Sequence, residues 1–237
     1  MIPLIKAFAI DIDGTLTENG GGMIHLPAMQ NLRTLEKLGF RIIYVTGRSS
    51  VEAYMLSVFG GTTKIAVGEN GGVVTISPTK HILMGNKEKC MNGYRILTRK
   101  LENVKLKNVF DRMTEVVLER SFDIEVGKQI LKDNNLSLDL SDSKYSFHIN
   151  NIGINKATGL AKALDILKIK PSETVTIGDS ETDIPLFQFC AFSIALNHAD
   201  EVVKSKANYV VSQKSGKGLV EALDYIALNF FGKNAIK

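Results

Sequence analysis

Short apolar runs rich in β-branched residues alternate along the chain with longer stretches in which apolar residues recur every three or four positions. The runs AFAI (7–10), RIIYVT (41–46) and ETVTIG (173–178) are typical of buried strands. Stretches 27–38 and 155–168 have the spacing of amphipathic helices. This alternation is typical of βα units around a mostly parallel sheet, so we predict an α/β protein with a doubly wound sheet.

The same reasoning predicts the remaining elements of this sheet. Ser49 and Glu52 form an S-x-x-E capping box, which predicts a helix that begins there and reaches about residue 59. Further strands are expected at 63–67, 192–196 and 208–211, a hairpin at 73–84, and helices at 183–189 and 216–231.

The alternation is interrupted in the middle of the chain. The pattern there predicts helices at 86–103 and 123–134 and strands at 114–119, 136–140 and 144–150. These elements describe a small α+β module. We therefore predict a core domain made of residues 1–84 and 153–237, with residues 85–152 inserted as a second domain.

Composition narrows the class of protein. The 29 basic and 25 acidic residues leave a formal charge of +4, and the lysines are scattered instead of forming a stripe, so we expect no nucleic-acid partner. No apolar run approaches the ~20 residues of a membrane span, and the N-terminus lacks a signal-peptide pattern. Cys90 and Cys190 belong to no metal-binding or CxxC pattern, which favours free thiols and a cytoplasmic location. The sequence leaves a homodimer open.

Polar residues follow several predicted strands directly. In open parallel sheets, ligands bind beyond the carboxyl ends of the strands. Alone, each residue has an ordinary explanation: an Asp-Gly pair closes turns, a helical lysine is usually solvated, and aspartates cap helices. Together they predict a site at one sheet edge. Its candidates are Asp11, Asp13, Thr46, Gly47, Arg48, Lys156, Asp179 and Asp183.

The chemistry of these side chains indicates phosphoryl transfer. Carboxylates gathered without a counter-charge repel one another, and a divalent cation relieves that repulsion. Because the chain offers oxygen ligands and no Cys/His set, Mg²⁺ is the expected ion. A cation, a lysine and a threonine hydroxyl around a carboxylate suit a phosphoryl group, and an aspartate can attack phosphorus.

Four segments resemble the ordered motifs of the haloacid dehalogenase superfamily, specifically its Mg²⁺-dependent phosphatases. They are DIDGT (11–15), VTGR (45–48), NKATGL (155–160) and GDSETDIPLF (178–187). The first two motifs lie too close to hold a cap between them, whereas a long segment separates the second from the third. This arrangement resembles the Cof and sucrose-phosphate phosphatase branch, and the small insertion resembles the caps of its archaeal phosphoglycolate phosphatases.

The resemblance implies a Rossmann-like core and a role for each reacting residue. Asp11 would attack phosphorus to form an aspartyl-phosphate. Asp13 would begin protonated, give its proton to the leaving alkoxide and later take one from water. Thr46 and the Gly47 amide would bind phosphoryl oxygens, and Lys156 would neutralise the nucleophile and the phosphate.

The resemblance also implies which residues bind the metal ion, and it implies that the cap contacts the substrate. Mg²⁺ would be held by the Asp11 carboxylate, the Asp13 carbonyl, Asp179 and Asp183. The chain departs from the family pattern at Thr182 of the fourth motif, where asparagine is usual. Three glycines, 20–22, follow DIDGT, and the sequence does not explain them. Further residues expected to contact the substrate or its phosphate are Arg112 and His148 in the cap and Asn197 in the core.

We expect a small phosphorylated metabolite as substrate, with 2-phosphoglycolate first and sugar phosphates second. A phosphomannomutase-like phosphotransferase would use the same aspartyl-phosphate. A non-catalytic ligand-binding protein on this fold is a further alternative, which the intact set of acidic and basic residues disfavours.

Overall fold

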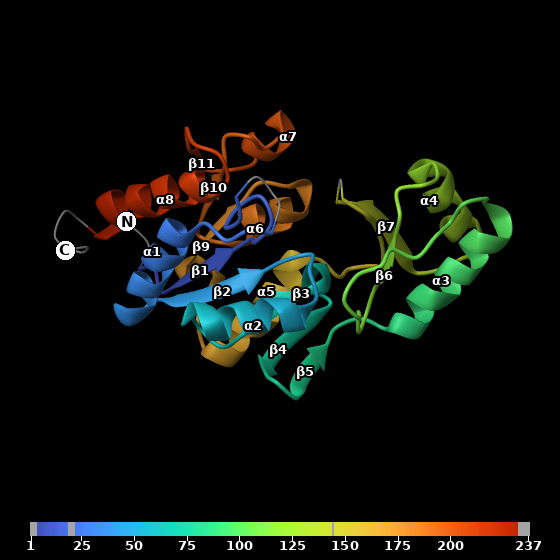
Figure 1. Ribbon diagram of the computed structural model, residues 1–237, viewed down its shortest axis with the longest axis horizontal. Coiled ribbons are helices and arrows are strands. Elements are labelled where there is room, and N and C mark those ends of the chain that lie inside the picture. The colour runs from blue at the N-terminus through green and yellow to red at the C-terminus, as the bar shows by residue number, and fades with distance from the viewer. Residues whose placement is uncertain (1–3, 19–21, 144, 232–237) are drawn as a thin grey trace.

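The structure, a computed structural model that describes residues 4–18, 22–143 and 145–231, has two lobes of unequal size (Figure 1). The larger lobe contains a sheet of eight strands. These are β1 (Ala7–Ile10), β2 (Arg41–Val45), β3 (Ala66–Gly68), β4 (Val73–Ser77), β5 (Lys80–Leu83), β9 (Thr174–Gly178), β10 (Phe192–Ala195) and β11 (Tyr209–Val210).

The strand order of this sheet creates a switch point at its centre. The order is β11-β10-β9-β1-β2-β3-β4-β5, and β4 pairs in antiparallel fashion with both of its neighbours, β3 and β5, while the other neighbouring strands pair in parallel. The chain leaves β1 toward β2 and β3, and later runs from β9 outward to β10 and β11. The direction of winding therefore reverses between β1 and β9, the place where open α/β sheets bind ligands.

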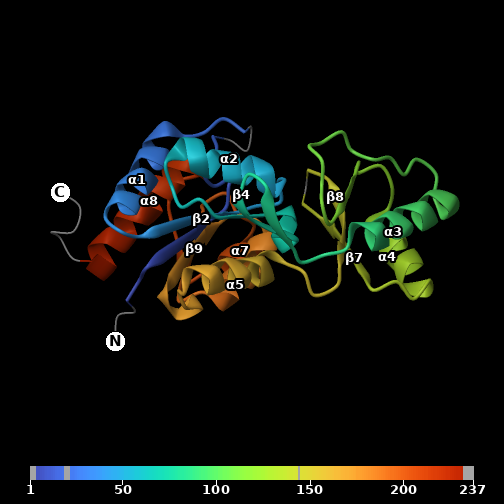
Figure 2. The same cartoon turned by 90° about the horizontal axis from the view of Figure 1, so that it is seen from below.

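Helices cover both faces of the large sheet (Figure 2). One face carries α1 (Leu26–Lys37), α2 (Ser50–Gly60) and α8 (Ser215–Ile226), and the other carries α5 (Lys156–Leu167), α6 (Ile184–Phe189) and α7 (Glu201–Lys204). Along β1, Phe8 and Ile10 are buried against the first group, and Ala7 and Ala9 against the second. This alternation follows from the two-residue period of a strand and confirms the doubly wound α/β prediction.

The smaller lobe is built by the middle of the chain. It consists of α3 (Lys87–Lys100), β6 (Val116–Leu118), α4 (Ile124–Asp133), β7 (Leu138–Asp142) and β8 (Phe147–Asn151). Its strands pair in the antiparallel order β6-β8-β7, and Leu97, Leu131 and Ile149 join its helices and sheet in one apolar cluster. We refer to this lobe as the cap, and its exact bounds at residues 85 and 152 stay our proposal.

Several elements differ in detail from those expected. β3 begins at Ala66 instead of Thr63, and the Thr63 hydroxyl takes the place of a strand pairing by accepting from the Ile42 amide of β2 at 3.0 Å and donating to the carboxylate of Glu36 at 2.8 Å. The last helix continues past α8 as one π-helical turn, Ala227–Phe231. The capping box of Ser49 and Glu52 is confirmed. Gly20 and Gly21 lie outside the described residues.

None of the helices in the described part of the chain has the length and apolar character needed to span a bilayer.

Candidate active site

Two acidic residues stand at the switch point of the sheet. Asp11 follows β1 directly, and Asp179 follows β9. The Asp11 amide donates to the carbonyl of Ile177 at 3.1 Å, so the two strand ends are joined at the point where the side chains emerge. The sheet therefore brings together the carboxylates that the sequence places after separate strands.

Lys156 connects this pair to a third carboxylate. Its ammonium group lies 2.7 Å from Oδ1 of Asp11 and 2.7 Å from Oδ1 of Asp183. All three side chains are at most 5% exposed. Lys156 is the first residue of α5, and the Asn155 side chain caps that helix by accepting from two backbone N–H groups. A buried, directional ion pair thus stands beside the expected nucleophile.

The charges of this cluster depend on one another. Burial raises the pKa of Asp11 well above its ordinary value, the Lys156 cation lowers it, and the nearby Asp183 and Asp179 raise it again. Burial alone would lower the pKa of Lys156, but the attraction of Asp11 and Asp183 outweighs burial and raises it. Lys156 therefore stays cationic and is the main group that favours an ionised Asp11.

Asp183 is mainly a supporting residue of the loop after β9. Its Oδ2 accepts hydrogen bonds from the Asp179 amide at 3.1 Å, the Ser180 amide at 3.0 Å and the Ser180 hydroxyl at 2.9 Å. The Thr182 hydroxyl, where asparagine was expected, lies 2.8 Å from the Ser180 hydroxyl. With Lys156 on its other oxygen, Asp183 orients the loop that presents Asp179.

The acidic residues fit a divalent cation. One carboxylate oxygen each from Asp11, Asp179 and Asp183 lie within 4.8 Å of one another. Asp179 is oriented by Thr15, whose hydroxyl donates to it at 2.7 Å, and by His198, whose Nε2 lies 3.2 Å away. These are hard oxygen donors, the set that suits Mg²⁺ rather than zinc.

Gly14 explains why a glycine follows the two aspartates of DIDG. Its φ is +83°, in the left-handed region, and a Cβ at this position would overlap the carboxyl group of Asp179. A side chain would therefore strain the backbone and displace a metal-site carboxylate. The tight turn lets the β1 and β9 loops approach each other closely.

Asp13 is held by Arg48, a candidate at the sheet edge that had no role assigned from the sequence. Arg48 donates from Nε to one carboxylate oxygen at 2.7 Å and from Nη2 to the other at 2.8 Å, and its Nη1 lies 3.1 Å from Glu52. The hydrogen bond to Asp13 is the largest cause that raises the pKa of Arg48. A bidentate pair fixes both the position and the plane of the Asp13 carboxylate.

The loop after β2 lies against the cap. The buried Thr46 hydroxyl accepts from the Arg48 amide at 3.1 Å, and the Gly47 carbonyl accepts from Nη1 of Arg112 at 3.0 Å. Arg112 also lies 3.5 Å from Glu115, and its buried Nε has no hydrogen-bond partner among the residues that the structure describes. The structure thus brings the predicted cap arginine to the loop expected to bind phosphate.

Two other predicted contacts lie elsewhere. His148 is buried in the cap, where Nδ1 lies 2.9 Å from Glu115 and Nε2 lies 2.9 Å from the Ser146 hydroxyl. The exposed Asn197 donates to the Ser212 carbonyl at 2.7 Å. The hydrogen bonds of the described residues join neither side chain to the carboxylate cluster, so their substrate roles stay predictions.

Sequence reasoning did not identify Thr15 and His198 as site residues, and it placed Arg48 at the sheet edge without giving it a role. Thr15 and Arg48 end the quoted motifs DIDGT and VTGR, so the motifs themselves contained the signal. His198 follows β10 closely, and the rule that ligands gather beyond strand ends could have found it.

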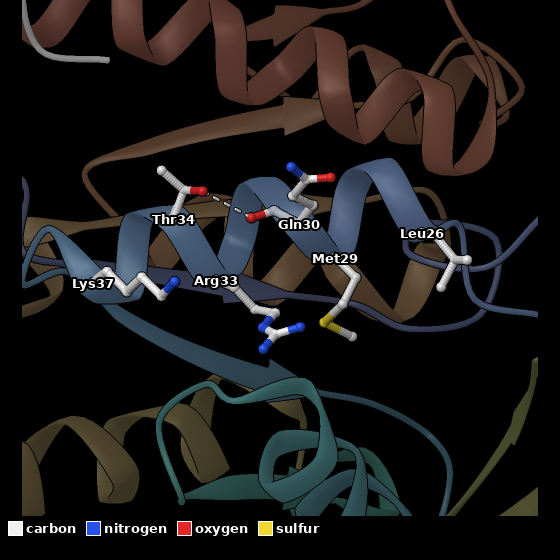
Figure 3. A pocket seen from close by; sticks show the side chains of 6 residues that line it. All are labelled: Leu26, Met29, Gln30, Arg33, Thr34 and Lys37. Atoms are coloured by element: carbon white, nitrogen blue, oxygen red, sulfur yellow. Dashed lines mark hydrogen bonds between the residues drawn. The ribbon is translucent and has the colours of Figure 1, made fainter. Parts of the chain in front are cut away.

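A hollow of about 440 Å³ lies elsewhere, on the surface of α1 (Figure 3). All of the side chains that line it belong to that helix: Leu26, Met29, Gln30, Arg33, Thr34 and Lys37. It contains none of the carboxylates described above. The convergence of charged groups, and not the size of a hollow, therefore locates the site.

The fold and site define a hydrolase class in which carboxylates and a lysine meet at the switch point of a capped α/β sheet. A family model described as haloacid dehalogenase-like hydrolase matches residues 8–92 and 86–223. The chain belongs to this family, which confirms the resemblance of its four motifs.

Particular relatives narrow the comparison. The chain is 52% identical over 222 residues to the phosphoglycolate phosphatase of Nitrosopumilus maritimus, an alignment that covers 94% of this chain and 96% of that protein. It is 35% identical to the phosphoglycolate phosphatase of Archaeoglobus fulgidus, with 94% and 97% covered. A crystal structure from Thermoplasma acidophilum matches with a TM-score of 0.82 and 23% identity over 95% of this chain and 99% of that one, which shows the shared fold.

Proposed function

We propose that the protein is a Mg²⁺-dependent phosphomonoesterase that hydrolyses 2-phosphoglycolate to glycolate and phosphate. The observation that carries this proposal is the buried Asp11 carboxylate, paired at 2.7 Å with Lys156 and close to Asp179 at the switch point. The high identity to a relative named phosphoglycolate phosphatase supports the choice of substrate. Its two free cysteines support a cytoplasmic location.

In the proposed reaction, a carboxylate oxygen of Asp11 forms a bond to phosphorus while the bond from phosphorus to the glycolate oxygen breaks. Asp13 gives its proton to that oxygen. Water then attacks the aspartyl-phosphate, Asp13 takes a proton from it, and phosphate leaves as the Asp11 carboxylate is restored. Lys156 balances the charge of the nucleophile throughout.

Mg²⁺ would be held by the carboxylates of Asp11 and Asp179 and the backbone carbonyl of Asp13, with Asp183 in support. When bound, it neutralises negative charge on the phosphoryl oxygens. Thr46 and the Gly47 amide would bind the same oxygens.

The ion pair between Asp13 and Arg48 must open before Asp13 can act as the acid in the first step. The bidentate contact, at 2.7 and 2.8 Å, binds the carboxylate form of Asp13. The proton-carrying form needed at the start therefore requires this contact to open. Substrate entry beside Gly47 supplies an anion that can compete for the guanidinium of Arg48.

The substrate carboxylate has a partner in the cap. Arg112 donates to the Gly47 carbonyl, and its buried Nε–H finds no acceptor in the described part of the chain. A guanidinium in this position can bind the carboxylate of 2-phosphoglycolate once its phosphate lies against the same loop. Sugar phosphates lack that carboxylate, so this contact favours phosphoglycolate.

The test is phosphate release from 2-phosphoglycolate, several sugar phosphates and nucleotides, measured with Mg²⁺ and with EDTA. We expect Mg²⁺-dependent release with the highest kcat/KM for 2-phosphoglycolate. Arg112→Met should raise the KM for that substrate by about tenfold or more, the value of one charged hydrogen bond. Absence of release from every compound would refute the proposal, and a preference for a sugar phosphate would refute its choice of substrate.

A further inference from the structure

Glu69 lies in an unusual turn between the core and the cap. It directly follows β3 and is fully buried. Glu69 and Asn70 have φ values of +54° and +52°, both in the left-handed region, which Asn tolerates but which costs a residue such as Glu about 1–2 kcal/mol. Two consecutive residues of this kind need strong surrounding contacts to persist, and such positions are concentrated at functional sites.

The carboxylate of Glu69 binds the cap. Its Oε2 accepts from the Thr114 amide at 2.8 Å and the Thr114 hydroxyl at 2.8 Å, and its Oε1 accepts from the Met113 amide at 2.9 Å. These donors precede β6 of the cap, 44 and 45 positions away along the chain. A carboxylate suits this position because it only accepts, whereas a glutamine would turn a donor toward another N–H group.

The backbone of the same turn binds the phosphate loop. The Glu69 amide donates to the Arg48 carbonyl at 2.8 Å, and the Asn70 amide donates to the Thr46 carbonyl at 3.1 Å. Arg112 of the cap contacts the same loop, because its guanidinium donates a hydrogen bond to the Gly47 carbonyl. Segments 46–48, 69–70 and 112–114 therefore form one hydrogen-bonded unit.

The burial of Glu69 also indicates that its contacts are specific. Burial raises its pKa, the hydrogen bonds from the cap lower it, and the neighbouring Glu115 raises it. Burying a carboxyl group without partners is costly, so the cap loop and Glu69 stabilise one another's position.

We propose that Glu69 is a positioning residue that fastens the cap loop to the phosphate-binding loop and thereby sets where Arg112 meets the substrate. This inference rests on the proposed function only in naming that substrate. Glu69 acts through Arg112 and does not itself touch the reacting atoms. Losing its contact releases residues 112–114 while the carboxylates and Lys156 of the core stay in place.

The substitutions Glu69→Gln and Thr114→Val test this role from both sides of the contact. We expect each to raise the KM for 2-phosphoglycolate, by about tenfold for Glu69→Gln and less for Thr114→Val, which removes a single hydrogen bond. kcat/KM for p-nitrophenyl phosphate, which has no carboxylate for Arg112, should change less than about twofold. Thr114→Val should add little in the Glu69→Gln background, because both changes weaken the same contact.

Glu36→Gln is the matched control. The Glu36 carboxylate also accepts from a backbone N–H, that of Ile42 at 3.1 Å, and from a threonine hydroxyl, that of Thr63 at 2.8 Å. Glu36 belongs to the last turn of α1, and its carboxylate contacts the start of β2, at the opposite end of the strands from the site. This variant reports the loss of a comparable structural contact, and we expect the KM for both substrates to stay unchanged.

Hydrogen exchange gives a readout that needs no substrate. In Glu69→Gln the amides of Met113 and Thr114 should exchange at least about tenfold faster, while those of β1 and β9 keep their wild-type rates. Unchanged exchange at these amides, or an equal loss of kcat/KM for both phosphate esters, would overturn the inference. If the wild type releases phosphate only from esters other than 2-phosphoglycolate, the substrate proposal fails, and the exchange result still decides the role of Glu69.

Discussion

Replacing Lys156 by methionine should destabilise the folded protein strongly. The Lys156 ammonium lies 2.7 Å from Asp11 and 2.7 Å from Asp183, and each contact is worth about 6 kcal/mol by Coulomb's law at an effective dielectric constant of about 20. Desolvation of the buried groups cancels much of this gain. Removing one partner of a buried pair nevertheless costs about 3–5 kcal/mol, because the remaining charges have no compensation.

The loss should depend on pH in a defined direction. Without Lys156, the Asp11 pKa loses its main lowering influence and stays raised by burial. A group whose pKa is raised in the folded state stabilises the fold at low pH and loses that contribution as pH rises through the folded pKa. The destabilisation of Lys156→Met should therefore be larger at about pH 8 than at about pH 5.

The assay is urea unfolding of the wild type and variant in EDTA at both pH values. Lys162→Met is the matched control, since Lys162 belongs to the same helix α5 but is 39% exposed and lies 3.4 Å from Asp165. Its free energy of unfolding should change by less than about 1 kcal/mol. A Lys156→Met variant within about 1 kcal/mol of the wild type at both pH values would refute the reasoning about this cluster.

Three further changes have defined outcomes. Arg48→Met removes the bidentate contact that orients the Asp13 carboxylate when it acts as the base in the second step. It should lower kcat by about tenfold or more, a loss that a matching kcat for wild type and variant would contradict. Gly14→Ala and Gly39→Ala both place a side chain at positive φ, but only the first overlaps Asp179, so activity assays should show a loss in Gly14→Ala alone. Burial raises the pKa of Cys90 and Cys190 to about 12, so the folded protein keeps these thiols protonated above the pH at which they ionise in the unfolded chain. The free energy of unfolding, measured by urea titration from about pH 9 upward, should therefore fall more steeply with pH in the wild type than in a variant with alanine at both positions.

The elements of the fold could be predicted because their signals are local. The capping box at Ser49 depends on a residue three positions away, and the helix after Asn155 depends on its own apolar spacing. The meeting of Asp11 and Asp179 also followed from the sequence, since parallel strands end at one edge of a sheet, and Lys156 stands at the start of the helix with which the α/β alternation resumes. Periodicity together with that rule was therefore sufficient for the centre of the site.

The contacts that orient the site could not be predicted in the same way. Arg48 and Asp13 lie 35 positions apart, and which way the arginine turns depends on packing between two loops. Glu69 finds its partners in the cap, 44 and 45 positions later, and no periodic pattern relates them. Such interactions depend on three-dimensional packing between loops of the core and between the core and the cap, which the local sequence pattern does not determine.

The role of Asp11 as nucleophile is the central claim, and trapping of the phosphorylated enzyme tests it most directly. Enzyme mixed with Mg²⁺ and 2-phosphoglycolate labelled with ³²P is quenched with acid, and label on the protein is measured before and after hydroxylamine. We predict label on the wild type that hydroxylamine removes, and neither label nor turnover in Asp11→Asn. Full turnover by Asp11→Asn would contradict the account.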